Sequence, residues 1–255
     1  DNTGRVETLR LVGEKIVPGH VPGTLTAQDM PDSLGFSSVS IRGNQVFRCR
    51  PEEGSGLRRY APDQQAPEVL CAAASIASPV LVGQWAVYGG LDGRLYVAPL
   101  TAQGKPWSFA TAFGKPITAP VCVCDGHIYF GCEDGYLYVL GPQGTAPLPT
   151  DDLQLTRIRT PLKGKLAGAE HDWYTTFGDF ANTNCNQQGI EPPLKLKWIR
   201  RYEGTFKHLP VCGGGRMYTH TAEGQIFAVE QETGRLLWRR FFPGVHACYT
   251  APLYC

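Results

Sequence analysis

The stretch from Pro210 to Trp238 constrains the fold most, because it holds three short strand-like segments separated by turns. It reads PVCGGGRMYTHTAEGQIFAVEQETGRLLW, with glycine-containing turns at 213–215, 223–224 and 232–235. Apolar and aromatic runs of about five residues between such turns are typical of antiparallel hairpins. Three strands in so short a stretch leave no room for a helix, and the unit therefore predicts a small antiparallel sheet.

The same pattern occurs twice upstream, as PVLVGQWAVYGGLDGRLYVAPL from Pro79 and as PVCVCDGHIYFGCEDGYLYVL from Pro120. The turn glycines Gly93 and Gly135 are 42 residues apart, and Gly224 follows about two periods later. A period near 40 that is built only of short strands predicts propeller blades, in which four-stranded sheets bury their faces against their neighbours. We therefore expect an all-β fold, a β-propeller of four-stranded antiparallel blades.

Weaker copies extend the array on both sides. Residues 39–75 hold a faint copy, residues 8–12 and 14–17 are expected as strands, and 251–254 resembles the start of another copy. Residues 141–170 carry four prolines and predict a long connection. We expect blades in 1–140, a linker in 141–170 and a further sheet region in 171–255. This is either parts of two propellers or one ring with an insertion, and missing chain or a partner chain would close the ring.

The segment 228–238, AVEQETGRLLW, resembles the tryptophan-docking motif of pyrroloquinoline-quinone (PQQ) repeat propellers, Ala-x-Asp-x-x-Thr-Gly-Lys-x-x-Trp. Glu230 stands where that family has Asp, and Arg235 stands where it has Lys. The resemblance implies that Trp238 packs between neighbouring blades. Trp107 resembles a degenerate copy, and residues 172–183 and 194–198 are similar to the segment that leads into the first blade of bacterial quinoprotein propellers.

Composition excludes several classes of function. The formal charge is +1, from 24 basic and 23 acidic residues, and gives no electrostatic case for a nucleic-acid partner. No apolar run approaches the 18 or so residues of a membrane span. Nine cysteines are an odd number, and no Cys-x-x-Cys spacing predicts a zinc or haem site. Because the sequence begins at Asp1 without Met or a signal peptide, we expect a processed, exported bacterial protein.

No catalytic, cofactor-binding or metal-binding residue is predicted. The quinoprotein resemblance implies PQQ beneath a disulfide of adjacent cysteines, with calcium held by Glu and Asn, and no adjacent cysteines occur. Asp134 and Glu223 are interpreted as hairpin-turn residues. The basic run at 195–201 is interpreted as a solvated strand face rather than an RNA-binding surface. The histidines show no metal-binding pattern and are expected to be structural; they are His127 and His220 in strands, and His171, His208 and His246 at element edges.

The sequence therefore predicts a non-catalytic PQQ-like propeller module for binding or scaffolding, with no cofactor. Its partner is expected to be a protein or the remaining propeller chain, and a small ligand would fit at the mouth of the central channel. Two alternatives stay open. One is a segment of a PQQ- and calcium-dependent quinoprotein dehydrogenase, and the other is a docking platform that resembles the envelope assembly lipoproteins built from the same repeat.

Overall fold

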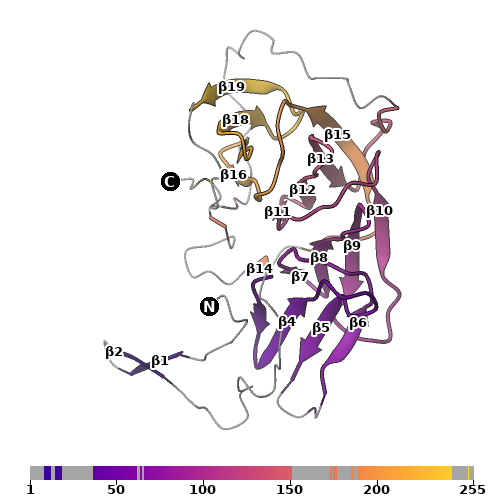
Figure 1. Cartoon of the computed structure of the whole chain (residues 1–255), viewed down its shortest axis with the longest axis vertical. Coiled ribbons are helices and arrows are strands. Elements are labelled where there is room, and N and C mark those ends of the chain that lie inside the picture. The colour runs from indigo at the N-terminus through magenta and orange to yellow at the C-terminus, as the bar shows by residue number, and fades with distance from the viewer. Residues whose placement is uncertain are drawn as a thin grey trace.

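The computed structural model describes residues 9–12, 15–18, 37–61, 64, 66–150, 173, 175–176, 185–186, 189–242 and 252. These residues contain strands and turns and no helix, which confirms the all-β prediction. An N-terminal hairpin pairs Leu9–Val12 (β1) with Lys15–Pro18 (β2), where the sequence predicted two strands. The strands that follow form four antiparallel sheets arranged along an arc (Figure 1).

The first and second sheets are meanders in which each strand pairs with the next one in the chain. Both coincide with predicted copies of the repeat. The strands of the first sheet are Ser40–Arg42 (β3), Gln45–Cys49 (β4), Leu57–Tyr60 (β5) and Glu68–Cys71 (β6). Those of the second sheet are Val80–Val82 (β7), Trp85–Gly89 (β8), Arg94–Pro99 (β9) and Trp107–Ala110 (β10).

The third sheet takes its last strand from far along the chain. Its first three strands are Cys122–Cys124 (β11), His127–Gly131 (β12) and Tyr136–Gly141 (β13). Lys195–Arg201 (β15) then pairs antiparallel with β13 as the fourth strand. Residues 142–194 thus separate the third strand of this sheet from its fourth strand in the chain.

The fourth sheet is again a meander, of Val211–Gly213 (β16), Arg216–His220 (β17), Gln225–Glu230 (β18) and Leu236–Phe241 (β19). The first strands of the second, third and fourth sheets converge, because β11 lies beside both β7 and β16. Two pieces of the 142–194 segment reach this inner edge. Cys185–Asn186 (β14) pairs parallel with β7, and the backbone of Trp173 exchanges two hydrogen bonds of 2.9 Å with Cys212 of β16.

The turn glycines occupy equivalent positions in three sheets, as the repeat predicted. Gly93, Gly135 and Gly224 each come directly before the third strand of their sheet, with φ of 76°, 82° and 87°. Residues other than glycine rarely adopt this left-handed backbone conformation. In each turn the glycine N–H donates to the carbonyl three residues earlier. These glycines therefore set the hairpin geometry that the three sheets share.

Close packing between sheets uses a second pair of glycines, Gly89 and Gly131, which end β8 and β12. A Cβ atom on Gly89 would lie 2.3 Å from the side chain of Ile117, and one on Gly131 would lie 2.3 Å from that of Phe206. Ile117 and Phe206 belong to the segments that lead into the next sheet. The missing side chains thus let the chain insert an apolar residue between successive sheets.

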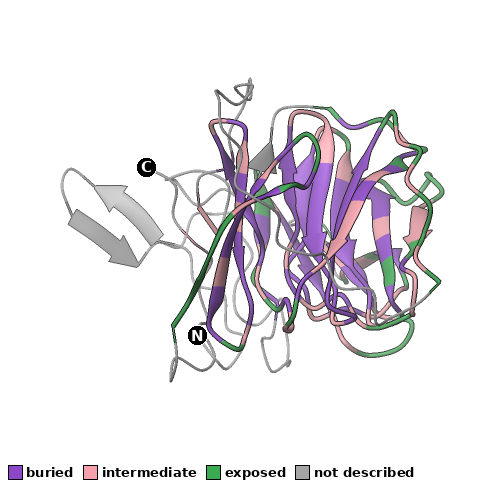
Figure 2. Ribbon diagram, turned by 90° about the horizontal axis from the view of Figure 1, so that it is seen from above, coloured by how far each residue is buried: buried purple, intermediate pink, exposed green. Residues whose placement is uncertain are grey.

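Burial increases toward the middle of the array. Every residue of β11 and β13 is buried, because the second and fourth sheets cover both faces of the third sheet. In Figure 2 the buried residues follow the strands, and the exposed ones gather in the connecting turns. The last strand, β19, differs from the central strands: of its six residues only Leu236 is buried and the last four are exposed.

The tryptophans of the outer strands share one register position. Trp107, Trp198 and Trp238 pair with Val97, Val139 and Ala228, which follow the three equivalent turn glycines at the same distance. Sequence analysis placed Trp238 between two blades, and this prediction is wrong, because 41% of Trp238 is exposed on the outer strand of the last sheet. Trp198 takes the buried position, and 3% of it is exposed.

Trp198 joins the third sheet to the fourth. Its Nε1–H donates to the carbonyl oxygen of Gln231 at 2.8 Å. Its ring packs against Gly234 so closely that a Cβ atom on this glycine would lie 2.5 Å from the nearest ring carbon. The turn of the AVEQETGRLLW segment therefore packs against Trp198 of the preceding sheet. The tryptophan of the segment itself, Trp238, is exposed on the outer strand of the fourth sheet.

Candidate functional site

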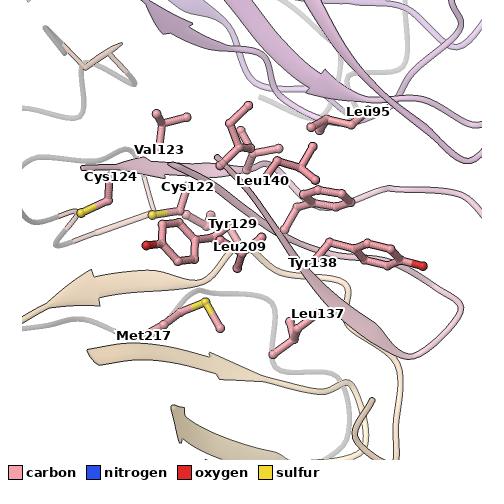
Figure 3. Close-up of a cluster of buried hydrophobic side chains, with 14 of the residues drawn as sticks. Leu95, Cys122, Val123, Cys124, Tyr129, Leu137, Tyr138, Leu140, Leu209 and Met217 are labelled. Carbon is pink, nitrogen blue, oxygen red and sulfur yellow. The ribbon is translucent and has the colours of Figure 1, made fainter. Parts of the chain in front are cut away.

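Three cysteine side chains gather between the inner strands of the third and fourth sheets. Cys122 and Cys124 lie on one face of β11, and Val123 lies on the other (Figure 3). Across the interface, the sulfur of Cys212 on β16 is 3.5 Å from that of Cys122. No more than 1% of any of these three residues is exposed. We call Cys122, Cys124 and Cys212 the thiol cluster.

Polar groups of both sheets surround the thiol cluster. The side-chain amide of Gln231 donates from Nε2 to the sulfur of Cys124 at 3.5 Å and to the hydroxyl of Tyr129 at 3.2 Å. The other amide atom, Oε1, is buried and has no hydrogen-bond partner. Gln231 is buried and follows β18 directly. Because its amide bonds to Cys124 of β11 and Tyr129 of β12, it links the fourth sheet to these two strands of the third.

A more exposed ion pair lies beside this interface. Lys197 of β15 contacts Glu232 at 2.7 Å and the Nε2 atom of His127 at 3.2 Å. The Nδ1 atom of His127 is 2.6 Å from the carbonyl oxygen of Asp125. Burial and the charge of Lys197 lower the pKa of His127, so its imidazole is neutral near pH 7. His127 is thus the first residue of β12 and contacts both β15 and the turn that precedes its own strand.

In the folded chain the pKa of each thiol in the cluster is raised. Burial raises the pKa of the Cys122 and Cys212 thiols. The hydrogen bond with Cys212, followed by burial, raises the pKa of Cys124. The thiolate is the nucleophile and the metal ligand, so three protonated and buried thiols offer neither role at neutral pH. The sequence does not predict the thiol cluster, because Cys212 belongs to a different repeat from Cys122 and Cys124.

Asp134 acts within its own hairpin, as interpreted from the sequence, whereas Glu223 bonds to a residue outside its hairpin. Asp134 accepts hydrogen bonds from the backbone N–H of Tyr136 at 2.9 Å and from the hydroxyl of Tyr138 at 2.6 Å. Burial raises the pKa of its carboxyl, and these hydrogen bonds oppose the rise. Glu223 accepts from the N–H and hydroxyl of Thr205 at 2.8 and 2.9 Å. Burial raises its pKa and the hydrogen bonds lower it, with a net decrease.

Two histidines of the described residues, His208 and His220, form a stacked pair. The rings of His208 and His220 are 4.7 Å apart at an angle of 26°. Burial, and then the neighbouring His220 and Lys207, lower the pKa of His208 to about 4. His171 and His246 lie outside the described residues.

The basic run of β15 packs more closely than a solvated strand face would. Lys195 alone is exposed. Arg200 donates to the carbonyl of Thr233 at 2.6 Å and lies 5.9 Å from the Trp198 ring, while Arg201 lies 5.5 Å from the Tyr136 ring. The interpretation as a solvated face therefore holds only for the start of the strand, because the turn of the fourth sheet and the tyrosines of the third cover the rest.

No metal site can be assembled from the described part of the chain. Among those residues, no three His, Cys, Asp or Glu side chains lie close enough together to hold a metal ion. The calcium that accompanies PQQ is a hard cation that needs several oxygen ligands, and the described residues offer it no cluster of three acidic side chains. The same residues contain no helix with the length and apolar character needed to cross a membrane.

Comparison with known proteins gives one relative in sequence and several in structure. No protein-family model matches the chain. It is 29% identical over 107 residues to a polyvinylalcohol dehydrogenase of Sphingopyxis sp. (strain 113P3), a match that covers 41% of this chain and 16% of the relative. This chain thus corresponds to a small part of that enzyme's length.

Two solved structures illustrate the structural matches. BamB from Moraxella catarrhalis matches with a TM-score of 0.40 and 19% identity, over 81% of this chain and 61% of that one. The β-propeller domain of Myceliophteria thermophila Cps50 (Swd1) matches with a TM-score of 0.49 and 11% identity, over 78% and 57%. From its own sheets, the described chain is an open array of four β-propeller blades, with sequence similarity to a polyvinylalcohol dehydrogenase.

Proposed function

We propose that this chain is a non-catalytic propeller module that binds another protein through β19, the exposed outer strand of its fourth sheet. The observation that carries the proposal is the exposure of three aromatic residues at the end of the array. Trp238, Phe241 and Phe242 are 41%, 60% and 47% exposed. Exposed aromatic side chains are enriched at protein interfaces.

The buried counterpart of Trp238 indicates what would cover it. Trp198 has the same register in the third sheet, and the Gln231–Gly234 turn of the next sheet covers it. A matching partner for Trp238 is a further blade-like sheet that offers a glycine turn and a carbonyl acceptor. We propose that another protein chain supplies this sheet, which would extend the open array.

We also propose that the protein is exported from a bacterial cytoplasm. This rests on the resemblance of residues 228–238 to the PQQ repeat, which occurs in exported bacterial propellers. The binding of a small ligand at the channel mouth and the envelope docking role stay as narrower proposals of the same kind.

A second candidate function follows from the sequence relative. The match to a polyvinylalcohol dehydrogenase favours a role as one segment of a larger redox enzyme. Because the described residues offer calcium no cluster of three acidic side chains, we assign no residue of this chain to cofactor chemistry.

Sedimentation velocity over a range of concentrations tests the binding role. With a second copy of the chain as the partner, we expect the wild-type chain to associate through the exposed strand β19, and the double variant Trp238→Ala, Phe241→Ser to remain monomeric. Arg240→Ala is the matched control, because it removes an exposed side chain from the same strand and leaves the aromatic residues in place. Equal association of the double variant would contradict the proposed surface.

The catalytic alternative needs its own measurement. PQQ and Ca²⁺ are added to the purified chain, and tryptophan fluorescence and dye reduction with alcohols are followed. We expect neither saturable quenching nor turnover. Turnover would overturn the non-catalytic role and support the dehydrogenase.

A further inference from the structure

We propose that Cys122 and Cys212 form a disulfide when the chain folds under oxidising conditions, and that this bond joins the inner strands of the third and fourth sheets. The two sulfur atoms already face each other at 3.5 Å across the interface. A disulfide needs the two sulfur atoms to approach to about 2.0 Å.

The neighbouring contacts select this pair from the thiol cluster. Cys124 is on the same strand face as Cys122, and cysteines two residues apart on one strand do not bond to each other easily. Cys124 also hydrogen-bonds Cys212, but its sulfur is shared with the amide of Gln231 at 3.5 Å and with the carboxylate of Asp125 at 3.8 Å. Cys212 is held in place by the two backbone hydrogen bonds between its strand and Trp173.

The reaction is a two-step thiol–disulfide exchange with a low-molecular-weight disulfide, R–S–S–R, as the oxidant. The thiolate of one cysteine attacks a sulfur of the oxidant and expels R–S⁻, which leaves a mixed disulfide. The thiolate of the second cysteine attacks the protein sulfur of that mixed disulfide and expels a second R–S⁻. The two thiol protons pass to the two R–S⁻ groups, and two electrons pass from the cysteines to the oxidant.

The exchange takes place during folding rather than in the finished protein. Both thiols are fully buried, and burial raises their pKa, so the closed interface excludes the oxidant and holds little thiolate. Once formed, the bond would close a loop between positions separated by 90 residues. Such a loop constrains the unfolded chain strongly and raises the thermal midpoint of unfolding.

The test refolds the full chain in a mixture of oxidised and reduced glutathione, or in dithiothreitol, and then maps its disulfides by non-reducing peptide mass spectrometry. The probe is glutathione, so the result depends neither on the proposed partner nor on the proposed location. We expect a peptide pair that links Cys122 to Cys212, and a Tm about 10 °C higher than in dithiothreitol.

Variants separate this bond from general effects of oxidation. Cys122→Ser and Cys212→Ser should each lose the linked peptide and the Tm difference. Cys132→Ser is the matched control, because Cys132 is equally buried but donates to the carbonyl of Lys115 at 3.3 Å rather than to a sulfur; it should keep both. A map without a Cys122–Cys212 link would overturn the proposal, and the wild-type map decides this even if a variant fails to fold.

Discussion

At the scale of single residues, one indole group shows how two sheets are held together. Trp198 comes from the third sheet, yet its hydrogen bond and its ring contact are both made with the turn of the fourth. The indole N–H is satisfied and the ring is almost fully desolvated, so this side chain contributes apolar burial and specific geometry together. Trp238 has the same register but no such cover.

This difference predicts unequal effects of truncation. Trp198→Ala should lower the free energy of unfolding by about 3–5 kcal/mol, as truncations of buried aromatic residues do. Trp238→Ala is the matched control and should cost less than about 1.5 kcal/mol, because the side chain is 41% exposed. Chemical denaturation followed by circular dichroism measures both. Equal losses would contradict the assignment of Trp198 as the residue that joins the sheets.

His208 should make stability depend on pH. Its pKa is about 4 in the folded chain, chiefly through burial, against 6.5 for an unperturbed histidine. Between these values the unfolded chain binds more protons than the folded one, and stability therefore falls as the pH drops from about 6.5 to 4.

The measurement is the denaturant midpoint of wild type and His208→Asn at pH 7 and at pH 5. Wild type should lose more stability between the two pH values than the variant loses, since the variant lacks the titrating ring. The same loss in both proteins would show that other groups carry the pH dependence.

At the scale of the element, the third strands of the second and third sheets use one repeated device. Each is preceded by an Asp-Gly turn, and in each a tyrosine hydroxyl donates back to the turn aspartate at 2.6 Å, from Tyr96 to Asp92 and from Tyr138 to Asp134. The third sheet buries this bond, whereas in the second it is exposed. The hydroxyl of Tyr138 also accepts the N–H of Ala112 at 3.1 Å and so links the two sheets.

The effect of deleting the hydroxyl should follow this burial. Tyr138→Phe leaves a buried carboxylate oxygen and a backbone N–H without their partner, and should cost about 1–3 kcal/mol. Tyr96→Phe removes the corresponding hydroxyl where water can replace it, and should cost less than about 1 kcal/mol. Equilibrium denaturation compares the two. A larger effect at Tyr96 would contradict the argument from burial.

Local elements could be predicted well from the sequence, and the contacts between distant elements could not. The glycine turns and alternating apolar runs located the strands of the four sheets, including the weak copy at 39–75. The same patterns gave no sign that β15 pairs with β13, because the period is interrupted by residues 142–194.

Trp198 was missed for a related reason. Residues 194–198 resemble the segment that leads into the first blade of quinoprotein propellers, and this resemblance hides the repeat position of Trp198. Its spacing before Pro210 is similar to that of Trp107 before Pro120. The thiol cluster needs cysteines of two repeats to meet at one interface, and the strand pattern of a single repeat carries no information on this.

At the scale of the whole molecule, the array is a row of sheets that contact their neighbours through inserted apolar side chains. Ile117 fills the space beside Gly89 between the second and third sheets, and Phe206 fills the space beside Gly131 between the third and fourth. Both side chains are fully buried. Stability should therefore be distributed over separate interfaces, as in other repeat architectures.

The two interfaces should contribute independently. Ile117→Ala should cost about 2–5 kcal/mol and Phe206→Ala about 3–5 kcal/mol. The double variant should match the sum of the two within about 0.5 kcal/mol, because the two side chains lie at different interfaces, on either side of the third sheet. A double-mutant cycle by denaturation measures the difference. A coupling larger than this would mean that the sheets respond as one unit to a loss at either interface.

Because β15 lies far along the chain from β13, the third sheet cannot be completed early in synthesis on the ribosome. When β13 leaves the exit tunnel, the strand that will pair with it has not yet been made, and the 142–194 segment must be translated first. At about 5–20 residues per second this takes several seconds. During that time the outer edge of β13 has no strand beside it, and an unpaired apolar edge is a template for pairing with another chain. The third sheet, the best buried of the four in the finished protein, is thus the most vulnerable to misassembly while the chain is being synthesised.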